Sequence, residues 1–206
     1  SRSRGLGDVY KRQMYTYELS PIATLIEQAI VERMMEIVGY AEGFGTLTTG
    51  GSNGNMMGML CARQASHPMS SITGFDGSKY VAFVSAEAHY SVLMSANVVG
   101  IGYQNLVKVA CDSRGRMKPE SLVEEIVRAR TNGQTPFCII ATSGTTVRGA
   151  FDPLKEIANI AHDNNIWLHV DAAWGGSSLF SKRFRKLMDG VESVSYTHLR
   201  AHETST

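Results

Sequence analysis

One acidic side chain, Asp171, stands where a short apolar run ends. The run Ile166-Trp-Leu-His-Val170 is nearly continuous in apolar residues, which is typical of a strand buried on both faces of a parallel sheet. Ligands of open α/β sheets bind outside the carboxyl ends of such strands. The next residues, Ala172-Ala-Trp-Gly-Gly176, are mostly small and let a flat group approach the backbone. The pattern suits a carboxylate that pairs with the protonated nitrogen of a flat ring, and equally leaves open a carboxylate that only caps a following helix.

A glycine-rich turn, Gly50-Gly-Ser-Asn-Gly-Asn55, precedes an apolar helical run. Such a turn directs backbone N–H groups and the positive end of the helix dipole at one point, which suits a phosphate group. The turn is neither a GxGxxG motif nor a P-loop. It does match the G-x-S-x-G nucleophile elbow of α/β-hydrolases. Two alternatives therefore stay open beside the phosphate site: a hydrolase with Ser52 as its nucleophile, and a plain helix start with closely packed glycines.

Two more polar groups fall near the ends of predicted elements. His89 lies near the start of a helix predicted for 86–98, and Ser143-Gly-Thr-Thr146 follows a strand predicted for 136–142. Each of these features is weak evidence alone. Together with the glycine-rich turn and Asp171 they offer a phosphate cradle, a flat imidazole, hydroxyl groups and a buried anion. A phosphorylated, protonated aromatic ring is a ligand that needs all four.

Predicted strands and helices alternate along most of the chain, which favours an α/β fold. Such alternation is typical of βαβ units with right-handed crossovers and a mostly parallel sheet. A long helix begins at Ser20-Pro21 and ends at Gly39, and Asp152-Pro153 starts another as N-cap and first residue. The predicted strands are a short strand-like piece at 46–49 and four further strands at 80–85, 106–110, 136–142 and 166–171. The helix that starts at Asp152 extends to residue 162, and the other predicted helices are 51–63, 86–98, 118–130 and a basic one at 181–190.

The composition is that of an ordinary globular protein, with 206 residues, 43% hydrophobic and 19% charged. A net charge of +1 gives no indication of binding to nucleic acid or to an anionic membrane surface. No apolar run approaches the ~20 residues that cross a bilayer, and the N-terminus lacks a signal peptide's apolar core. Three scattered cysteines, Cys61, Cys111 and Cys138, lack metal-ligand spacing. We therefore expect no metal site, and reduced, buried thiols in a cytoplasmic protein.

Five segments resemble the pyridoxal-phosphate-dependent group II amino acid decarboxylases, the family of the glutamate, cysteine sulfinate, aspartate and aromatic amino acid decarboxylases. They are MYTYELSPIATLIEQ, TGGSNGNMMGMLCAR, SAEAHYS, ATSGTTVRGAFDPL and IWLHVDAAWGG. They cover nearly all of residues 14–193, and HVDAAWGG with SGTT-x-x-G-A-F-D-P is the most specific combination. DAAWGG and GAFDP favour the glutamate, cysteine sulfinate and aspartate branch. The resemblance implies a partial fold-type-I large domain, pyridoxal 5'-phosphate as cofactor, an amino acid substrate and a homodimeric parent.

The resemblance also implies roles for individual residues. Decarboxylation leaves a carbanion that the protonated cofactor ring absorbs, and an anion beside the ring nitrogen keeps that nitrogen charged. His89 and Asp171 are the expected catalytic residues. The expected cofactor contacts are Gly51 and Ser52 at the phosphate, His89 stacked on the ring, Thr146 at its polar edge, Ala173 beneath it and Asp171 at its nitrogen.

One family feature is missing. In the family an Asn-Pro-His-Lys motif follows about thirty residues after the DAAWGG strand, and its lysine forms the Schiff base. Here the only lysines after Asp171 are Lys182 and Lys186, and Glu203 occupies the place of the family lysine. A cofactor-binding pseudo-enzyme, or another fold-type-I enzyme such as an aminotransferase, therefore stays open as an alternative.

Both ends of the chain resemble translated linker sequence. Residues 1–13 and 194–206 are polar and unpatterned, so we expect them to lie outside the fold. Residues 14–193 are then an internal part of the cofactor-binding domain, truncated before the Schiff-base lysine. We expect the parent to decarboxylate an acidic amino acid and this chain alone to be inactive.

Overall fold

A computed structural model describes residues 17–18, 20–76 and 79–199. The chain forms two compact units, residues 1–47 and 48–206. The first unit contains helix α2 (Pro21–Val38), which starts with proline and ends at Gly39 in the left-handed conformation, φ 104°, as predicted. The Glu27 carboxylate accepts hydrogen bonds from Thr46 Oγ1 at 3.2 Å and from the Leu47 backbone N–H at 3.0 Å, so it ties the segment after the helix back to it.

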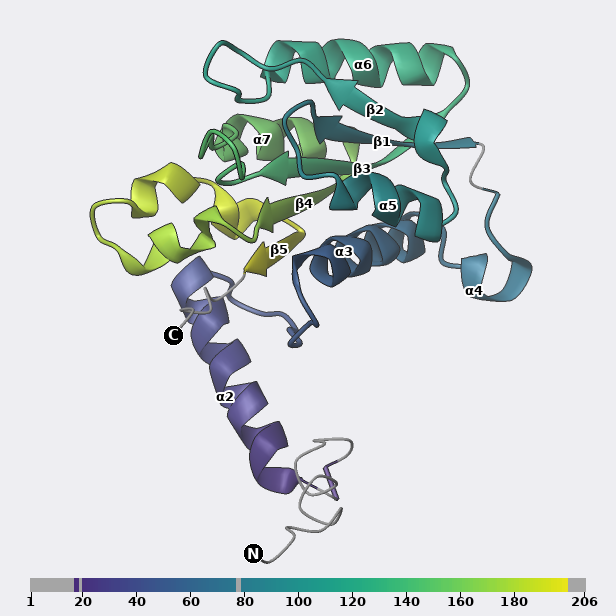
Figure 1. The fold of residues 1–206 in the computed structure, drawn as a ribbon. Helices are drawn as coiled ribbons and strands as arrows, with labels where there is room; N and C mark the ends of the chain where they lie inside the picture. Colours follow the sequence, from purple (N-terminus) through teal and green to yellow (C-terminus); the bar gives the residue numbers. More distant parts are fainter. Residues whose placement is uncertain (1–16, 19, 77–78, 200–206) are drawn as a thin grey trace, which may run out of the picture. The chain divides into compact units, whose positions relative to one another are not determined.

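The second unit is built on a five-stranded, all-parallel sheet with the strand order β2-β1-β3-β4-β5 (Figure 1). This confirms the predicted α/β fold with a parallel sheet. β3 lies at the centre, and every residue from Phe137 to Thr142 on it is buried, as expected for a strand covered on both faces. The strands are β1 (Tyr80–Ser85), β2 (Leu106–Val109), β3 (Thr135–Thr142), β4 (Trp167–Ala172) and β5 (Tyr196–Leu199).

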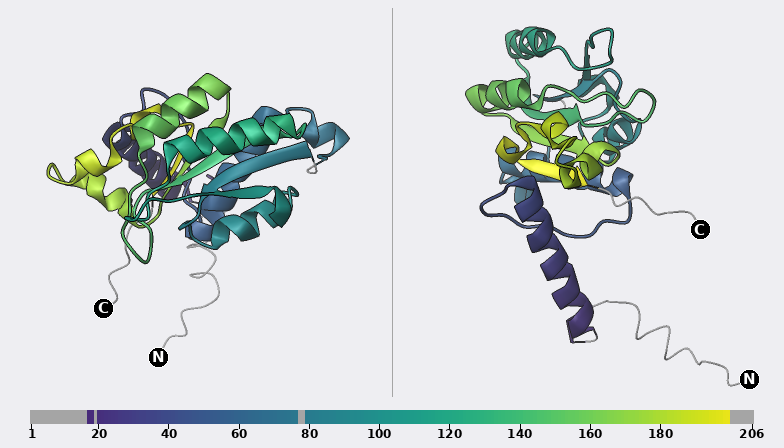
Figure 2. Two further views of the ribbon diagram at one scale, coloured as in Figure 1. Left: turned by 90° about the horizontal axis from the view of Figure 1, so that it is seen from above. Right: turned by 90° about the vertical axis from the view of Figure 1, so that its left-hand side faces the viewer.

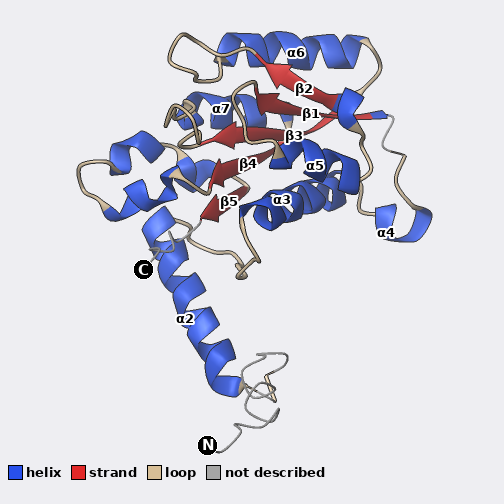
Figure 3. Cartoon of the chain, viewed as in Figure 1, coloured by secondary structure: helices blue, strands red, loops and turns tan. Residues whose placement is uncertain are grey.

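Helices cover both faces of this sheet (Figures 1 and 3). On one face, α3 (Gly51–Ser66) and α5 (Ser91–Val98) pack on β1 and β3 through a core that includes Met59, Val84 and Ile140. On the other lie α6 (Pro119–Thr131) and α7 (Leu154–Asn164), which Figure 2 shows side by side from above. The short helix α4 (Ser70–Thr73) and the 3₁₀ helices η2 (Tyr103–Asn105), η3 (Gly175–Phe180), η4 (Arg185–Met188) and η5 (Val191–Ser193) complete the unit.

The order of the strands creates one preferred place for a ligand. The chain runs from β1 outward to β2 and then crosses back over β1 to β3. The connections that follow β1 and β3 therefore leave the sheet in opposite directions, and a crevice opens at the carboxyl ends of these two strands. His89 follows β1, Ser143 follows β3, and Asp171 lies near the end of β4.

Three predicted elements were wrong. The strand-like piece 46–49 is not a strand, because Thr46 and Leu47 bond to Glu27. The helix predicted from residue 86 begins only at Ser91, because the Ala86 backbone N–H extends the sheet by donating to Val109 at 3.0 Å. The basic helix predicted at 181–190 is only the single 3₁₀ turn η4.

The C-terminal segment 194–206 contains a strand. β5 pairs in parallel with β4, in register from His169–Tyr196 to Ala172–Leu199. This segment was expected to lie outside the fold, because it has no apolar periodicity; its strand pairing comes from backbone groups. That residues 194–206 derive from a linker stays a prediction, and the equally predicted tail 1–13 lies outside the described residues. No helix among the described residues is long and apolar enough to cross a membrane.

Candidate active site

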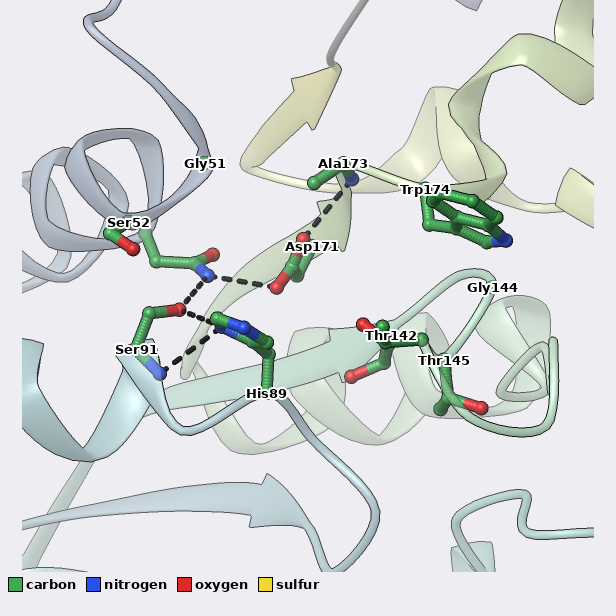
Figure 4. A pocket seen from close by; sticks show the side chains of 12 residues that line it. Gly51, Ser52, His89, Ser91, Thr142, Gly144, Thr145, Asp171, Ala173 and Trp174 are labelled. Carbon is green, nitrogen blue, oxygen red and sulfur yellow. Dashed lines mark hydrogen bonds between the residues drawn. The ribbon is translucent and has the colours of Figure 1, made fainter. Parts of the chain in front are cut away.

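A pocket of about 430 Å³ lies at the carboxyl end of the sheet, within the second unit (Figure 4). Its size is in the range of pockets that hold small ligands. All six site residues expected from the sequence line it, although they come from four separate parts of the chain: Gly51, Ser52, His89, Thr146, Asp171 and Ala173. Six further residues line it: Gly144 and Thr145, which belong to the predicted loop 143–146, and Asn55, Ser91, Thr142 and Trp174, for which no contact was predicted.

The N-terminus of α3 forms one side of the pocket. Gly51 is its first residue, and the preceding Gly50, at φ 128°, provides no side-chain cap. The first N–H groups of a helix have no partner within the helix, and here the first turn also carries no acidic residue. Uncapped N–H groups and the positive dipole end make this terminus suitable for an anion such as a phosphate.

The carboxylate of Asp171 lies at the base of the pocket and is only 5% exposed. Its Oδ1 accepts a hydrogen bond from the Ala173 backbone N–H at 3.1 Å, and its Oδ2 accepts one from Asn55 Nδ2 at 2.8 Å. These two bonds fix the plane of the carboxylate from two different elements. The loop after β4 and the first turns of α3 therefore share one anion.

Hydrogen bonds extend from Asn55 to both sides of Asp171. Asn55 Nδ2 also lies 3.0 Å from Ser91 Oγ, and Asn55 Oδ1 lies 2.7 Å from His169 Nε2. Ser91 in turn contacts His89, with its Oγ at 2.8 Å and its backbone N at 3.2 Å from His89 Nδ1. His89 is exposed in the loop before α5, and its ring centroid is 4.3 Å from that of Tyr90. An imidazole held through one nitrogen is oriented while its face stays accessible.

The loop after β3 forms the opposite wall (Figure 4). Thr142 Oγ1 is buried and has no hydrogen-bond partner among the described residues. Thr145 is buried and its hydroxyl accepts from the Ala150 backbone N–H at 3.0 Å, whereas Thr146 is exposed at the pocket. An unsatisfied hydroxyl that lines a pocket costs stability unless a ligand bonds to it.

The buried carboxylate of Asp152 stabilises the backbone of this wall. Its carboxylate accepts hydrogen bonds from the backbone N–H groups of Met117 at 2.6 Å and Thr142 at 2.7 Å. Burial nevertheless raises the pKa of Asp152 from 3.8 to about 6, against the lowering effect of these two bonds. The predicted N-cap role was wrong: no side chain caps α7, because the two buried N–H groups occupy the carboxylate.

The residues of the pocket fit a phosphorylated, flat, protonated ring. The uncapped start of α3 matches a phosphate, Asp171 matches a cationic nitrogen, and the small side chain of Ala173 leaves room beside it. The buried hydroxyl of Thr142 provides a further polar contact. These are the features that pyridoxal 5'-phosphate requires. Among the described residues no lysine lines this pocket; Lys182 and Lys186 line other surface hollows.

Asn55 makes three hydrogen bonds in the site but was not predicted as a site residue. A signal for it exists. Asn55, Met59 and Ala62 lie at helical spacing on the buried face of α3, with exposures of 1%, 0% and 0%. An amide on an otherwise apolar face must find partners, because a buried polar group without them is costly. The helical pattern could therefore have indicated a hydrogen-bonded asparagine, but not its partners.

Comparisons with known proteins agree with this geometry. The model of the pyridoxal-dependent decarboxylase conserved domain matches residues 5–203, and so extends into both predicted tails. The acidic amino acid decarboxylase GADL1 of Homo sapiens is 43% identical over 98% of this chain and 39% of its own length. The cysteine sulfinic acid decarboxylase of Mus musculus is 40% identical over 92% of this chain and 38% of its own. A crystal structure of mouse CSAD in apo form matches with a TM-score of 0.88 and 40% identity, covering 90% of this chain and 39% of that one.

Proposed function

Because the chain belongs to the pyridoxal-dependent decarboxylase family, we propose that the whole protein removes the α-carboxyl group of an acidic amino acid as CO2. The chain spans about 39% of the length of its curated relatives, so this activity belongs to a longer protein. The observation that carries the proposal is the buried carboxylate of Asp171, which faces the pocket opposite an uncapped helix N-terminus. A phosphorylated pyridinium carries complementary charges at its two ends.

When bound, the cofactor supplies a protonated ring that accepts the electron pair left behind as CO2 departs. The residues of this chain hold that ring. The N–H groups at Gly51 and Ser52 would bind its phosphate, and Asp171 would keep the proton on the ring nitrogen. His89 would cover one face of the ring and exclude water, with Ala173 beneath the other. Thr146 would bond to the polar edge.

The proposed substrate class follows from the relatives. GADL1 is named for acidic amino acids, and a second relative, from mouse, is named for cysteine sulfinic acid, which also carries a second negative group. We therefore propose glutamate, aspartate or cysteine sulfinate as substrate. The alternative hydrolase has less support: among the residues that the structure describes, no strand precedes the turn that carries Ser52, and no hydrogen bond links Ser52 to His89.

We further propose that this chain alone does not turn over substrate. The support is that no lysine lines the pocket among the described residues, while the family reaction uses one. A homodimeric, cytoplasmic whole protein is part of the same proposal.

The test is CO2 release by the complete protein that contains this chain. Purified with pyridoxal phosphate, it should release CO2 from at least one of the three acidic amino acids. Asp163→Asn, at the exposed end of α7, serves as a matched control for substitutions in the pocket. A folded, cofactor-loaded protein that only transaminates these substrates would refute the proposal.

A further inference from the structure

We propose that Asn55 is a positioning residue that sets the orientation of Asp171 and, through Ser91, the tautomer of His89. The inference rests on the proposed function, since both groups are the ones expected to act on the cofactor. Asn55 is 1% exposed and joins three elements: α3, which carries it, β4 with Asp171 and His169, and the start of α5 with Ser91.

The amide of Asn55 has one orientation that satisfies all its neighbours. A carboxamide offers two N–H donors and one carbonyl acceptor. Its Nδ2 faces Asp171 Oδ2 at 2.8 Å and Ser91 Oγ at 3.0 Å, while its Oδ1 faces His169 Nε2 at 2.7 Å. Turned by 180°, it would press a carbonyl oxygen against a carboxylate oxygen. The carboxylate therefore fixes the amide, and the amide requires the His169 proton on Nε2.

The second N–H of Asn55 determines the next hydrogen bond. Ser91 Oγ accepts from Asn55, so its own hydroxyl hydrogen is directed to His89 Nδ1, 2.8 Å away. The Ser91 backbone N–H points to the same nitrogen at 3.2 Å. With two donors converging on Nδ1, the proton of the neutral His89 ring belongs on Nε2. One buried amide thus aligns an anion and an imidazole that are 82 residues apart in sequence, Asp171 and His89.

The fold makes room for this arrangement at Gly58, one turn along α3 from Asn55. A Cβ at Gly58 would lie 2.6 Å from His169 Nδ1, so only a glycine allows the imidazole to lie against the helix. The position of His169, which is fully buried, in turn gives the Asn55 carbonyl its partner. The network is therefore built into the packing of α3 on β4.

Three variants of the complete protein test the inference. Asn55→Leu removes all three hydrogen bonds at similar size. Asn55→Asp keeps the shape and the acceptor toward His169 but replaces the donors toward Asp171 and Ser91. Asn97→Leu is the matched control, since it makes the same change at an exposed residue near the end of α5 that does not line the pocket.

The first measurement is made without cofactor. Imidazole 15N NMR shifts distinguish the two tautomers of a histidine. In the wild type and in Asn97→Leu, His169 and His89 should both carry the proton on Nε2. Asn55→Asp should leave His169 unchanged and convert His89 to a mixture, while Asn55→Leu should alter both. Unchanged tautomers in Asn55→Asp would overturn the inference, and this variant also decides the case if Asn55→Leu fails to fold.

The second measurement uses 15N-labelled pyridoxal phosphate and steady-state kinetics. Loss of the Asn55 donors should move the ring-nitrogen shift toward the unprotonated form and lower kcat by roughly 10- to 100-fold, with a smaller change in KM. Equal losses in Asn97→Leu and Asn55→Asp would overturn the inference. A wild type that releases no CO2 would refute the proposed function instead, and would leave the cofactor-free tautomers as an independent result.

Discussion

Gly144 and Gly175 contact each other through their backbones. A Cβ on Gly144 would lie 2.7 Å from both N and Cα of Gly175, and a Cβ on Gly175 would lie 2.4 Å from the carbonyl oxygen of Ser143. The Gly175 N–H also donates to that oxygen at 3.0 Å. Two sequence motifs, the loop after β3 and the turn after β4, are therefore joined without any side chain between them. The wall of the pocket depends on this contact.

Gly175→Ala should destabilise the protein by about 1–3 kcal/mol or more, because the added methyl group meets backbone atoms that cannot move independently. The free energy of unfolding in urea measures the effect. Gly43→Ala is the matched control: its Cβ would meet only the flexible Met35 side chain at 3.4 Å. Equal stabilities for the two variants would contradict the close contact.

Thr142→Val should make the cofactor-free protein more stable while weakening cofactor binding. The variant removes a buried hydroxyl that has no partner among the described residues, and an unsatisfied buried group costs about 1–3 kcal/mol. Unfolding midpoints without cofactor and a titration with pyridoxal phosphate separate the two effects. A variant that is less stable and binds equally well would show that this hydroxyl serves the fold and not the ligand.

Asp152 should make stability depend on pH. Because burial raises its pKa from 3.8 to about 6, the carboxyl group holds its proton more tightly in the folded than in the unfolded chain. The resulting stability is fully present below pH 3.8 and is lost as the pH rises through about 6. Asp152→Asn lacks this titration. Lowering the pH from 7 to 4 should therefore favour the wild type over the variant by about 2–3 kcal/mol in unfolding free energy. If the unfolding free energies of the wild type and of Asp152→Asn changed in parallel with pH, the raised pKa of Asp152 would be excluded.

Asp171→Asn in the complete protein should lower kcat/KM far more than Asp163→Asn. Loss of a charge-assisted contact to a buried cation costs about 1.5–3 kcal/mol, or roughly 10- to 150-fold. Asp163 lies at the exposed end of α7, with a side chain that is 76% exposed, and its loss should matter little. Steady-state rates of CO2 release compare the two. Similar rates would mean that Asp171 serves only the structure.

The 206-residue chain by itself should not bind pyridoxal phosphate covalently at one site. Borohydride reduction of the mixture, followed by peptide mass spectrometry, should find label only on scattered surface lysines. Lys182 and Lys186 line surface hollows away from the pocket, so neither is suitably placed. A single stoichiometric adduct at either one, together with CO2 release, would refute both the proposed inactivity and the assignment of the pocket.

The sequence predicted the position of the pocket because its signals are local. Each expected site residue lies near the end of a strand or the start of a helix, so Asp171, His89 and Gly51 could be placed from a few neighbouring residues each. Asn55 and Asp152 are different, because their roles depend on partners that only the folded chain brings near. Asp152 precedes a proline and a helix, a strong local cap signal, yet its carboxylate is occupied by Met117 and Thr142. The sequence around a residue cannot show whether its side chain will cap the next helix or bond to groups that are distant in the chain.

The imidazole of His169 fills the space that a side chain at position 58 of helix α3 would need. The two positions should therefore vary together among related proteins. Wherever position 58 carries a larger residue, position 169 should carry a smaller one, and the bond to Asn55 should be replaced. During evolution, alanine at position 58 would be tolerated only after residue 169 had been replaced by a smaller one. The steric clash between the two side chains therefore determines the order of the two substitutions.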